Sequence, residues 1–357
     1  MKEKIRKIRE FIEKEKLGCL LIDSPFEILY LLNIKKSFNF VELNMLLIIS
    51  PEKMFLITNP ITLSFLSENL PNDIKVIETE TQSYVEHHSR YIKEARQIIK
   101  TNKIVDVGLT STMYLDAAEK CIRVINPVLS LSAIKSSEEI KLIRKSAQIL
   151  RNVYKEIKKS IKTGCGEIEL RNEIDVLLHS QGSEKRAFPT RVAFGKNTSN
   201  IFPVSTMKRL EDNDIISLDM GGLYKGYMAD FGRTVFHGKV DAEKKEIYDI
   251  VLEAYKKMKA FIKPGIVASS ADRVVRDHFA EFGHAKFFFH PLGESVGFVK
   301  GGIALAPDNN NVIKPGMTFV VEPALYLPNW GGVKIKETIL ITEQGMEELT
   351  GGPGKDD

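Results

Sequence analysis

Two different spacings of apolar residues divide this chain into predicted helices and predicted strands. Residues 3–16 place Ile5, Ile8, Phe11 and Ile12 on one side, which is the spacing of an amphipathic helix. Short apolar segments between polar stretches then predict strands, at residues 19–22, 44–50, 54–58 and 104–108. A Pro-Glu-Lys turn separates the second and third of these segments, so a β-hairpin is expected over residues 44–58. Together these elements predict a small α/β domain of about 130 residues.

A long helix is predicted to open the second part of the chain. Ser136 is followed three residues later by Glu139, which is the pattern of a capping box at a helix N-terminus. The helix should run to about Lys162, and Gly164 just beyond it suits a left-handed C-cap. We therefore expect a domain boundary just before this helix.

The second part also contains an internal repeat. The segments that begin at Ile161 and Ile262 share identical residues at a constant offset of 101 positions, and each predicts an amphipathic helix. Each copy is followed by a predicted strand that ends in a carboxylate, Asp219 in the first and Glu322 in the second. Chance similarity between two amphipathic helices is the alternative explanation. A true duplication predicts two halves related by a pseudo-twofold axis, with a site between them.

Composition narrows the class of protein. Hydrophobic residues make up 43% of the chain and charged residues 27%, and the net charge is only +4. Because Lys and Glu are interleaved along the predicted helices, they indicate solvated faces rather than a nucleic-acid surface. No apolar run approaches the roughly 18 residues that span a membrane, and no secretion signal is expected. Cys19, Cys121 and Cys165 show neither metal-binding nor disulfide spacing, so we expect a cytoplasmic protein without nucleic-acid or membrane partners.

Two acidic residues mark the candidate chemistry. Asp219 and Asp230 lie eleven residues apart in LDMGGLYKGYMADFGRT, and Gly226 between them predicts a hairpin turn. The two side chains are then expected to meet across a pair of strands, where they repel unless a cation or a proton lies between them. A pair of exposed turn aspartates is the alternative interpretation.

Several motifs, in the same order, resemble those of the prolidase, aminopeptidase P, methionine aminopeptidase and creatinase superfamily. They are KSSEEIKLIRKSA, LDMGGLYKGYMADFGRT, HPLGESVG, IKPGMTFVVEPALY and GGVKIKETILITEQGMEELT, which lie within residues 135–350. The resemblance implies an α+β fold. A pita-bread domain with an internal pseudo-twofold repeat is expected over residues 133–357, preceded by a small creatinase-type α/β domain over residues 1–132. A homodimer that acts on a small peptide-like substrate is also implied.

The resemblance assigns metal-ligand roles to the acidic residues. Members of the superfamily hold two divalent metal ions with Asp, Asp, His, Glu and Glu, and the metals activate a bridging water. Asp219, Asp230 and Glu322 match three of these ligands. Glu294 stands in place of the ligand His, and Lys336 stands in place of the last Glu.

Other positions of the motifs carry implied roles in catalysis or substrate binding. His290 and Glu322 are expected to take part in catalysis, together with Arg233, which the GRT motif retains. Phe202 stands near the position of a further His of the superfamily, and Glu337 takes the position of the Asp beside the last ligand. These two residues are assigned to the substrate pocket.

The two exchanged ligands change what the site can bind. A protonated Lys cannot ligate a divalent ion, but its ammonium can fill the space of one metal and neutralise the same carboxylates. We therefore expect the two-metal site to be lost, with a salt bridge from Lys336 to Glu294 or to an aspartate in its place. The carboxylates of Asp219, Asp230, Glu294 and Glu322 would then hold at most one ion, Mn²⁺ or Mg²⁺, or none.

Three functions are compatible with such a site. The first is a divergent Xaa-Pro dipeptidase or creatinase-like protein that is weakly active or inactive as a metallopeptidase. The second is an atypical C–N hydrolase of a dipeptide-like or amidino substrate that works with one metal ion or none. The third is a non-catalytic protein-binding module. The sequence leaves open whether the protein is an enzyme, and an active one is expected to be a hydrolase.

Overall fold

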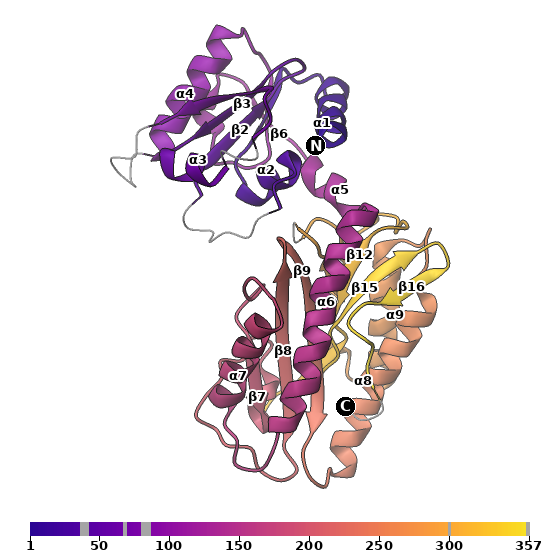
Figure 1. The fold of residues 1–357 in the computed structure, drawn as a ribbon. Coiled ribbons are helices and arrows are strands. Elements are labelled where there is room, and N and C mark those ends of the chain that lie inside the picture. Colours follow the sequence, from indigo (N-terminus) through magenta and orange to yellow (C-terminus); the bar gives the residue numbers. More distant parts are fainter. Residues whose placement is uncertain (36–42, 67–69, 80–86, 299–300, 355–357) are drawn as a thin grey trace. The chain divides into compact units, whose positions relative to one another are not determined.

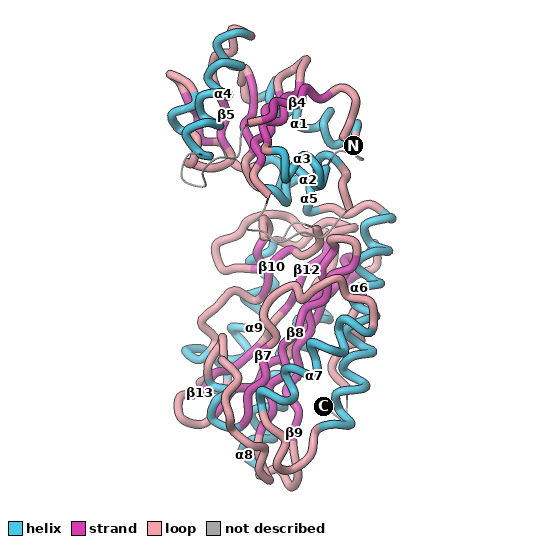
Figure 2. The backbone as a smooth tube through the Cα atoms, turned by 60° about the vertical axis from the view of Figure 1, so that its left-hand side comes forward, coloured by secondary structure: helices cyan, strands magenta, loops and turns pink. Residues whose placement is uncertain are grey.

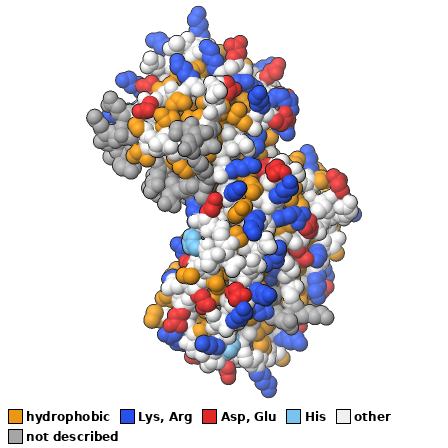
Figure 3. Space-filling view, in the orientation of Figure 1, with side chains coloured by type: hydrophobic (Ala, Val, Ile, Leu, Met, Phe, Trp, Pro, Cys, Tyr) orange, Lys and Arg blue, Asp and Glu red, His pale blue; other side chains and the backbone are white. Residues whose placement is uncertain are grey.

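The computed structural model describes residues 1–35, 43–66, 70–79, 87–298 and 301–354. The chain divides into two compact units, Met1–Ser132 and Ala133–Asp357 (Figure 1). Charged side chains of both signs are interspersed over the surface that Figure 3 shows, as the interleaved Lys and Glu residues predict. Within the described ranges, no helix combines the length and the apolar character needed to cross a membrane.

The first unit is built around a mixed sheet with the strand order β4–β3–β2–β1–β5–β6. Strands β2 and β3 form the hairpin that the sequence predicts, whereas the strand predicted at residues 104–108 starts later, at Val107. The strands are β1 (Cys19–Ile22), β2 (Met45–Ile49), β3 (Met54–Thr58), β4 (Ile74–Glu78), β5 (Val107–Leu109) and β6 (Cys121–Arg123). The helices are α1 (Lys2–Lys14), α2 (Pro25–Leu32), α3 (Pro60–Leu66), α4 (His87–Thr101) and α5 (Pro127–Ala133).

Burial explains the sequence patterns of this unit. Every residue of β2 and β3 is buried, so both strands carry consecutive apolar residues rather than alternating ones, and Thr58 at the end of β3 is the one polar residue among them. Helix α1 buries Ile5, Ile8 and Ile12, the face that their spacing predicts. Helix α4 packs Tyr91 and Ala95 into a core that it shares with the sheet.

The second unit opens with the predicted long helix, α6 (Ser137–Ile157). The Ser136 hydroxyl accepts a hydrogen bond from the Glu139 N–H at 3.3 Å, and the Glu139 carboxylate accepts one from the Ser136 N–H at 2.9 Å. These two bonds form the predicted capping box. The helix ends earlier than the predicted Lys162, because a 3₁₀ turn over Lys158–Ser160 closes it.

The internal repeat has the same structure in both copies. Helices α7 (Glu167–Ser180) and α9 (Ala268–Glu281) begin and end at the offset of 101 residues that the sequence shows. Gly164 (φ 85°) and Gly265 (φ 92°) lie just before them in the left-handed region that favours glycine. Gly164 therefore belongs to the turn that leads into α7, and the prediction that it caps the preceding helix was wrong.

The strands of the second unit form two sheets and a hairpin, with the helices outside them (Figure 2). The first sheet has the order β7–β8–β9 and the second β11–β10–β12–β15–β16, while β13 and β14 pair separately. Helix α8 (Ala242–Phe261) and α9 share a core with the second sheet. The strands are β7 (Arg191–Phe194), β8 (Ile215–Tyr224), β9 (Tyr227–Phe236), β10 (Gly293–Ser295), β11 (Ala304–Leu305), β12 (Thr318–Val321), β13 (Ala324–Leu327), β14 (Gly331–Lys334), β15 (Glu337–Thr342) and β16 (Gly345–Glu348).

The β8–β9 hairpin positions the two aspartates. Its turn lies at Lys225 and Gly226, as predicted. The prediction that the first strand ends at Asp219 was wrong, because β8 continues through Gly221 to Tyr224. The register places Gly221 opposite Asp230, and side chains two residues apart share a face, so both aspartates lie on one face of the hairpin.

Candidate functional site

A pocket of about 310 Å³ lies within the second unit. Both halves of the repeat contribute lining residues. The first half contributes residues of β7 and β8, and the second half contributes residues in and near β10 and β12. The lining residues are Phe188, Arg191, Ile201, Phe202, Asp219, His290, Pro291, Gly293, Glu294, Ala304, Glu322, Lys334 and Lys336.

Four residues that are paired across neighbouring strands form a cross-strand row at this pocket. Arg191 of β7 is opposite Asp219 of β8, which is opposite Gly232 of β9, and Gly232 forms a bridge to Lys336. A Cβ atom at Gly232 would lie only 2.8 Å from the Cβ atom of Lys336. Glycine at this position therefore allows Lys336 to come close to the aspartate of the neighbouring strand.

The ammonium of Lys336 lies among acidic side chains. Its Nζ atom is 3.2 Å from Asp219 Oδ1, 3.5 Å from Asp230 Oδ2 and 3.3 Å from Glu322 Oε1. Only 4% of the Lys336 side chain is exposed. Burial by itself would lower the pKa of Lys336, but the carboxylates of Asp219, Glu322 and Asp230 outweigh it and raise this pKa above its usual range. Lys336 is therefore a buried cation that contacts residues from β8, β9 and the end of β12.

Asp219 receives two further cations. The Lys334 Nζ atom lies 2.6 Å from Asp219 Oδ2, and Arg191 donates to the same oxygen at 3.2 Å. Burial would raise the pKa of Asp219, but the ammonium groups of Lys334 and Lys336, followed by the guanidinium of Arg191, hold it well below its ordinary value. Asp219 is therefore an ionised carboxylate with cations at both oxygens.

The sequence analysis missed Arg191 and Lys334. A signal for Lys334 was present, because it lies two residues before Lys336 and side chains at that spacing share a face of a strand. Arg191 gave no comparable signal, since its place in the site depends on the pairing of β7 with β8, which are distant in sequence.

His290 presents an acceptor to the pocket that it lines. Its Nδ1 atom lies 2.7 Å from the Pro291 carbonyl oxygen, which places the ring proton on Nδ1. Its Nε2 atom is buried and, within the described residues, has no hydrogen-bond partner, and the same holds for the hydroxyl of the adjacent Tyr326. Burial lowers the pKa of His290, so the neutral ring is favoured. His290 therefore offers an acceptor at this pocket.

Glu294 and Phe202 also line the pocket, as the sequence analysis expects for the site. Glu294 lies in the short strand β10, between β11 and β12. Phe202 is 62% exposed, and its ring centroid lies 4.9 Å from the Arg191 guanidinium carbon. Phe202 therefore forms part of the pocket wall and contacts a cation of the site.

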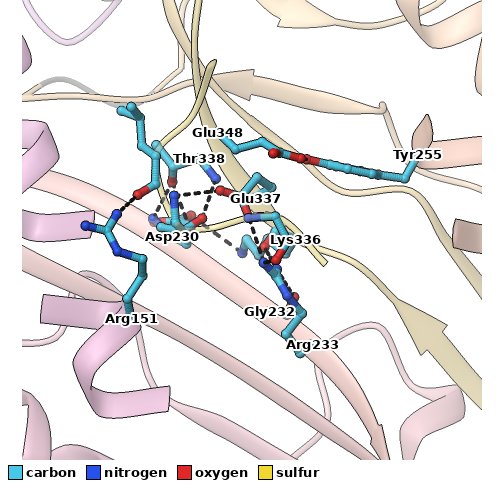
Figure 4. Close-up of polar contacts among 12 residues, drawn as sticks. Arg151, Asp230, Gly232, Arg233, Tyr255, Lys336, Glu337, Thr338 and Glu348 are labelled. Carbon is cyan, nitrogen blue, oxygen red and sulfur yellow. Dashed lines mark hydrogen bonds and ion pairs between the residues drawn. The ribbon is translucent and has the colours of Figure 1, made fainter. Parts of the chain in front are cut away.

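Arg233 and Glu337 are not among the residues that line this pocket, and the roles expected for them in catalysis and in the substrate pocket stay predictions. They form a buried ion pair of 2.7 Å, with 1% and 0% of their side chains exposed (Figure 4). Arg233 also donates to the carbonyls of Gly232, Lys336 and Gly352. Because Arg233 and Glu337 each follow a residue of the cross-strand row, they point to the opposite face of their strands. Their role is to hold the strands and the C-terminal segment together.

Within the part of the chain that the structure describes, no group of three His, Cys, Asp or Glu side chains is arranged to hold a metal ion. The family model described as metallopeptidase family M24 nevertheless matches residues 141–343, which is more than half of the chain. The chain belongs to metallopeptidase family M24. This confirms the membership that the sequence motifs predict.

Relatives of this M24 protein include named peptidases. The chain is 37% identical to an uncharacterised peptidase of Bacillus subtilis over 65% of its own length and 66% of that protein. It is also 37% identical to an Xaa-Pro dipeptidase of Pyrococcus horikoshii over 64% of its own length and 65% of that protein. The matched region thus spans slightly less than two thirds of these relatives.

Two solved structures match nearly the whole chain. The prolidase of Pyrococcus horikoshii superimposes with a TM-score of 0.86 at 29% identity, over 99% of this chain and 100% of that chain. An Xaa-Pro dipeptidase of Bacillus anthracis gives the same TM-score at 28% identity, over 99% and 98% of the two chains. The predicted fold is confirmed: α+β, with a pita-bread domain that contains a pseudo-twofold repeat and follows a small α/β domain.

Proposed function

We propose that this M24 protein is a divergent Xaa-Pro dipeptidase-like member whose two-metal site is replaced by an internal ion-pair cluster, so that it is weakly active or inactive as a metallopeptidase. The named relatives support the dipeptidase-like part of the proposal. The position of Lys336 supports the second part, because its ammonium contacts the carboxylates of Asp219, Asp230 and Glu322. Those are the residues to which the motifs assign metal-ligand roles.

The residues of the pocket do not fit a pair of divalent ions. An ammonium has three donors and no lone pair, so Lys336 cannot act as a ligand while it is protonated. Both oxygens of Asp219 already accept from cations, at 3.2 Å from Lys336 and 2.6 Å from Lys334. A divalent ion placed among the carboxylates of Asp219, Asp230 and Glu322 would be repelled by the ammonium of Lys336, which contacts all three. Glu294, as a carboxylate, adds a hard oxygen ligand but does not restore the nitrogen of a His.

The remaining groups support binding better than hydrolysis. Lys334 and Lys336 contact Asp219, and Lys336 also contacts Glu322, so both acids are paired with a cation and are weaker acceptors for a proton from water. His290, which lines the pocket, still provides an acceptor for a small polar ligand. A single ion, Mn²⁺ or Mg²⁺, would have to displace the ammonium of Lys336 to reach these carboxylates.

The proposal includes the other predicted properties of the protein. It is expected to form a homodimer in the cytoplasm, with a small first domain over residues 1–132 and the pita-bread domain over residues 133–357, and to take a small peptide-like ligand. The two alternative functions, an atypical C–N hydrolase and a protein-binding module, receive no support from the named relatives.

The homodimer is tested by measuring the molecular mass of the full chain in solution.

A pair of reverting substitutions tests the proposed function. The double variant Glu294→His, Lys336→Glu is expected to hydrolyse Ala-Pro or Met-Pro in Mn²⁺ at least about 100-fold faster than the natural chain, because it recovers the ligand set of the family. The single variant Glu294→His should hydrolyse these dipeptides as slowly as the natural chain, because the ammonium of Lys336 remains in the site. Lys256→Glu, which changes an exposed lysine, is the matched control. Rapid hydrolysis by the natural chain would refute the proposal, as would an active Glu294→His variant.

A further inference from the structure

Two side chains of helix α9 hold the loop that carries His290. This loop, residues 288–292, leads into strand β10. Asp272 and Arg276 lie one turn apart on α9 and form an ion pair of 2.5 Å, in which 1% of the Asp272 side chain is exposed. Arg276 also donates to the carbonyl oxygens of Phe288 at 2.8 Å and His290 at 2.7 Å. This ion pair therefore fixes the backbone in the first half of the loop.

The same ion pair fixes the second half of the loop. Asp272 Oδ1 accepts a hydrogen bond from the Leu292 N–H at 2.9 Å. The N–H and C=O groups of one trans peptide unit point in opposite directions, so the Pro291 carbonyl is directed away from Asp272. On that side its oxygen lies 2.7 Å from Nδ1 of His290. The contact with Asp272 therefore sets the position of the acceptor for the His290 ring.

This acceptor decides which ring nitrogen of His290 carries the proton. A carbonyl oxygen only accepts, so in the neutral ring the proton lies on Nδ1, the atom that faces Pro291. The Nε2 atom then keeps its lone pair, and it is buried and without a hydrogen-bond partner among the described residues. A ligand group that meets Nε2 must therefore be a donor.

The first half of the repeat uses the equivalent position in the same way. Asp175 of α7 lies 101 residues before Arg276, which is the offset of the repeat. It accepts from the Arg186 side chain at 2.7 Å and from the Thr190 hydroxyl at 2.5 Å. These two residues flank Phe188, which lines the pocket. A charged residue at this position of both repeat helices thus holds the pocket segment that follows the helix.

We infer that Asp272 and Arg276 are positioning residues, which fix His290 as the Nδ1–H tautomer and so present a hydrogen-bond acceptor at the pocket. Asp272 directs the Pro291 carbonyl, and Arg276 balances the buried charge of Asp272. Neither residue lines the pocket, so both act through the loop. The inference goes beyond the proposed function, because it requires neither a metal ion nor hydrolysis.

NMR of the histidine ring nitrogens in the full, isotope-labelled chain tests this inference. At about pH 8 a histidine is largely neutral, and the two nitrogen shifts then distinguish an N–H nitrogen from a bare one. The signals of His290 are those that His290→Gln removes. In the natural chain we expect the Nδ1–H form to exceed the Nε2–H form about tenfold, a ratio that one hydrogen bond can supply.

Two variants separate positioning from stability. The double variant Asp272→Leu, Arg276→Met removes both charges, so that no lone charge is buried, and should bring the two tautomers within about twofold of each other. Asp272→Asn keeps an oxygen that accepts from the Leu292 N–H, so it should keep the excess of the Nδ1–H form. A role in stability alone would leave the tautomer of a folded variant unchanged.

The matched control removes the equivalent pair of the first half. The double variant Asp175→Leu, Arg186→Met should leave the His290 tautomer unchanged, because that pair holds the segment around Phe188. An excess of the Nε2–H form in the natural chain would overturn the inference without any variant. An unchanged excess of the Nδ1–H form in Asp272→Leu, Arg276→Met would do the same. The spectra are recorded in EDTA, so two metal ions bound to the natural chain would refute the proposed function and leave this result intact.

Discussion

A Lys336→Met variant is expected to lose about 3–5 kcal/mol of stability at pH 7 relative to the natural chain. Methionine has nearly the same shape as the lysine stem, so packing around the side chain is kept. The carboxylates of Asp219, Asp230 and Glu322 lose the ammonium that lies 3.2 to 3.5 Å from them. Removing one partner from a buried ion cluster leaves uncompensated charge, which is far more costly than losing a surface pair. Thermal unfolding of the full chain measures the effect, and the midpoint should fall by about 6–20 °C.

The effect of Lys336→Met should depend on pH in a defined direction. The lowered pKa of Asp219 gives stability that is present above about pH 3.9 and is lost as pH falls through its folded pKa. The raised pKa of Lys336 gives stability that is present below about pH 10.4 and is lost as pH rises through its folded pKa. The natural cluster is therefore intact at both pH 5 and pH 7. In the variant the crowded carboxylates can take up a proton, so the loss of stability should shrink as pH falls from 7 to 5.

An exposed lysine provides the control for this prediction. Lys256 pairs with Glu253 at 3.3 Å, and 58% of its side chain is exposed. Lys256→Met should change stability by less than about 0.5 kcal/mol at either pH. The prediction is contradicted if Lys336→Met unfolds at the natural midpoint, or if its loss of stability grows as pH falls.

The second large effect is expected at the ion pair behind the site. Glu337→Gln should also destabilise the chain by about 3–5 kcal/mol, because it removes the charge that faces the buried guanidinium of Arg233. Both carboxylate oxygens of Glu337 have further roles, since they accept from the N–H groups of Thr350 at 2.6 Å and Gly352 at 3.1 Å. The variant should therefore loosen the segment around residues 350–352 as well as the strands. Chemical unfolding measures the first effect, and hydrogen exchange of these two amides measures the second.

The matched control changes a glutamate with an exposed partner. Glu253→Gln, at a side chain that is 50% exposed, is expected to stay within about 0.5 kcal/mol of the natural chain. A double variant, Arg233→Met with Glu337→Gln, should be more stable than the sum of the two single losses predicts, because no lone charge is then buried. Additive losses, or natural stability of Glu337→Gln, would show that the pair does not hold this region together.

The parts of the fold that could be predicted from the sequence are those that depend on residues close together in the chain. The apolar spacing of Ile5, Ile8 and Ile12, the capping box of Ser136 and Glu139, and the β2–β3 hairpin depend on residues close in sequence. The end of α6 was missed because a 3₁₀ turn closes the helix early. The length of β8 was missed because long-range packing extends this strand beyond Asp219, through Gly221 and Gly222. Glycine inside a strand marks close approach of neighbouring groups, and a Cβ at Gly221 would lie 2.5 Å from the Phe188 ring.

The residues of the site were also predicted only where the signal was local in sequence. The motifs located the acids and Lys336, and the structure gathers these residues at one pocket. Arg191 joins them through strand pairing that no local pattern reveals. Strand alternation alone separates Lys336 from Glu337, which explains why Lys336 lines the pocket and Glu337 does not.

The metal content of the natural chain tests the central claim most directly. The protein is purified, equilibrated with Mn²⁺ or Co²⁺, freed of unbound ions and measured by elemental analysis. If the Lys336 ammonium takes the place of the metals, the natural chain will hold at most one ion, and the double variant Glu294→His, Lys336→Glu will hold more. Two ions bound to each natural chain would contradict the replacement of the metal site by a lysine.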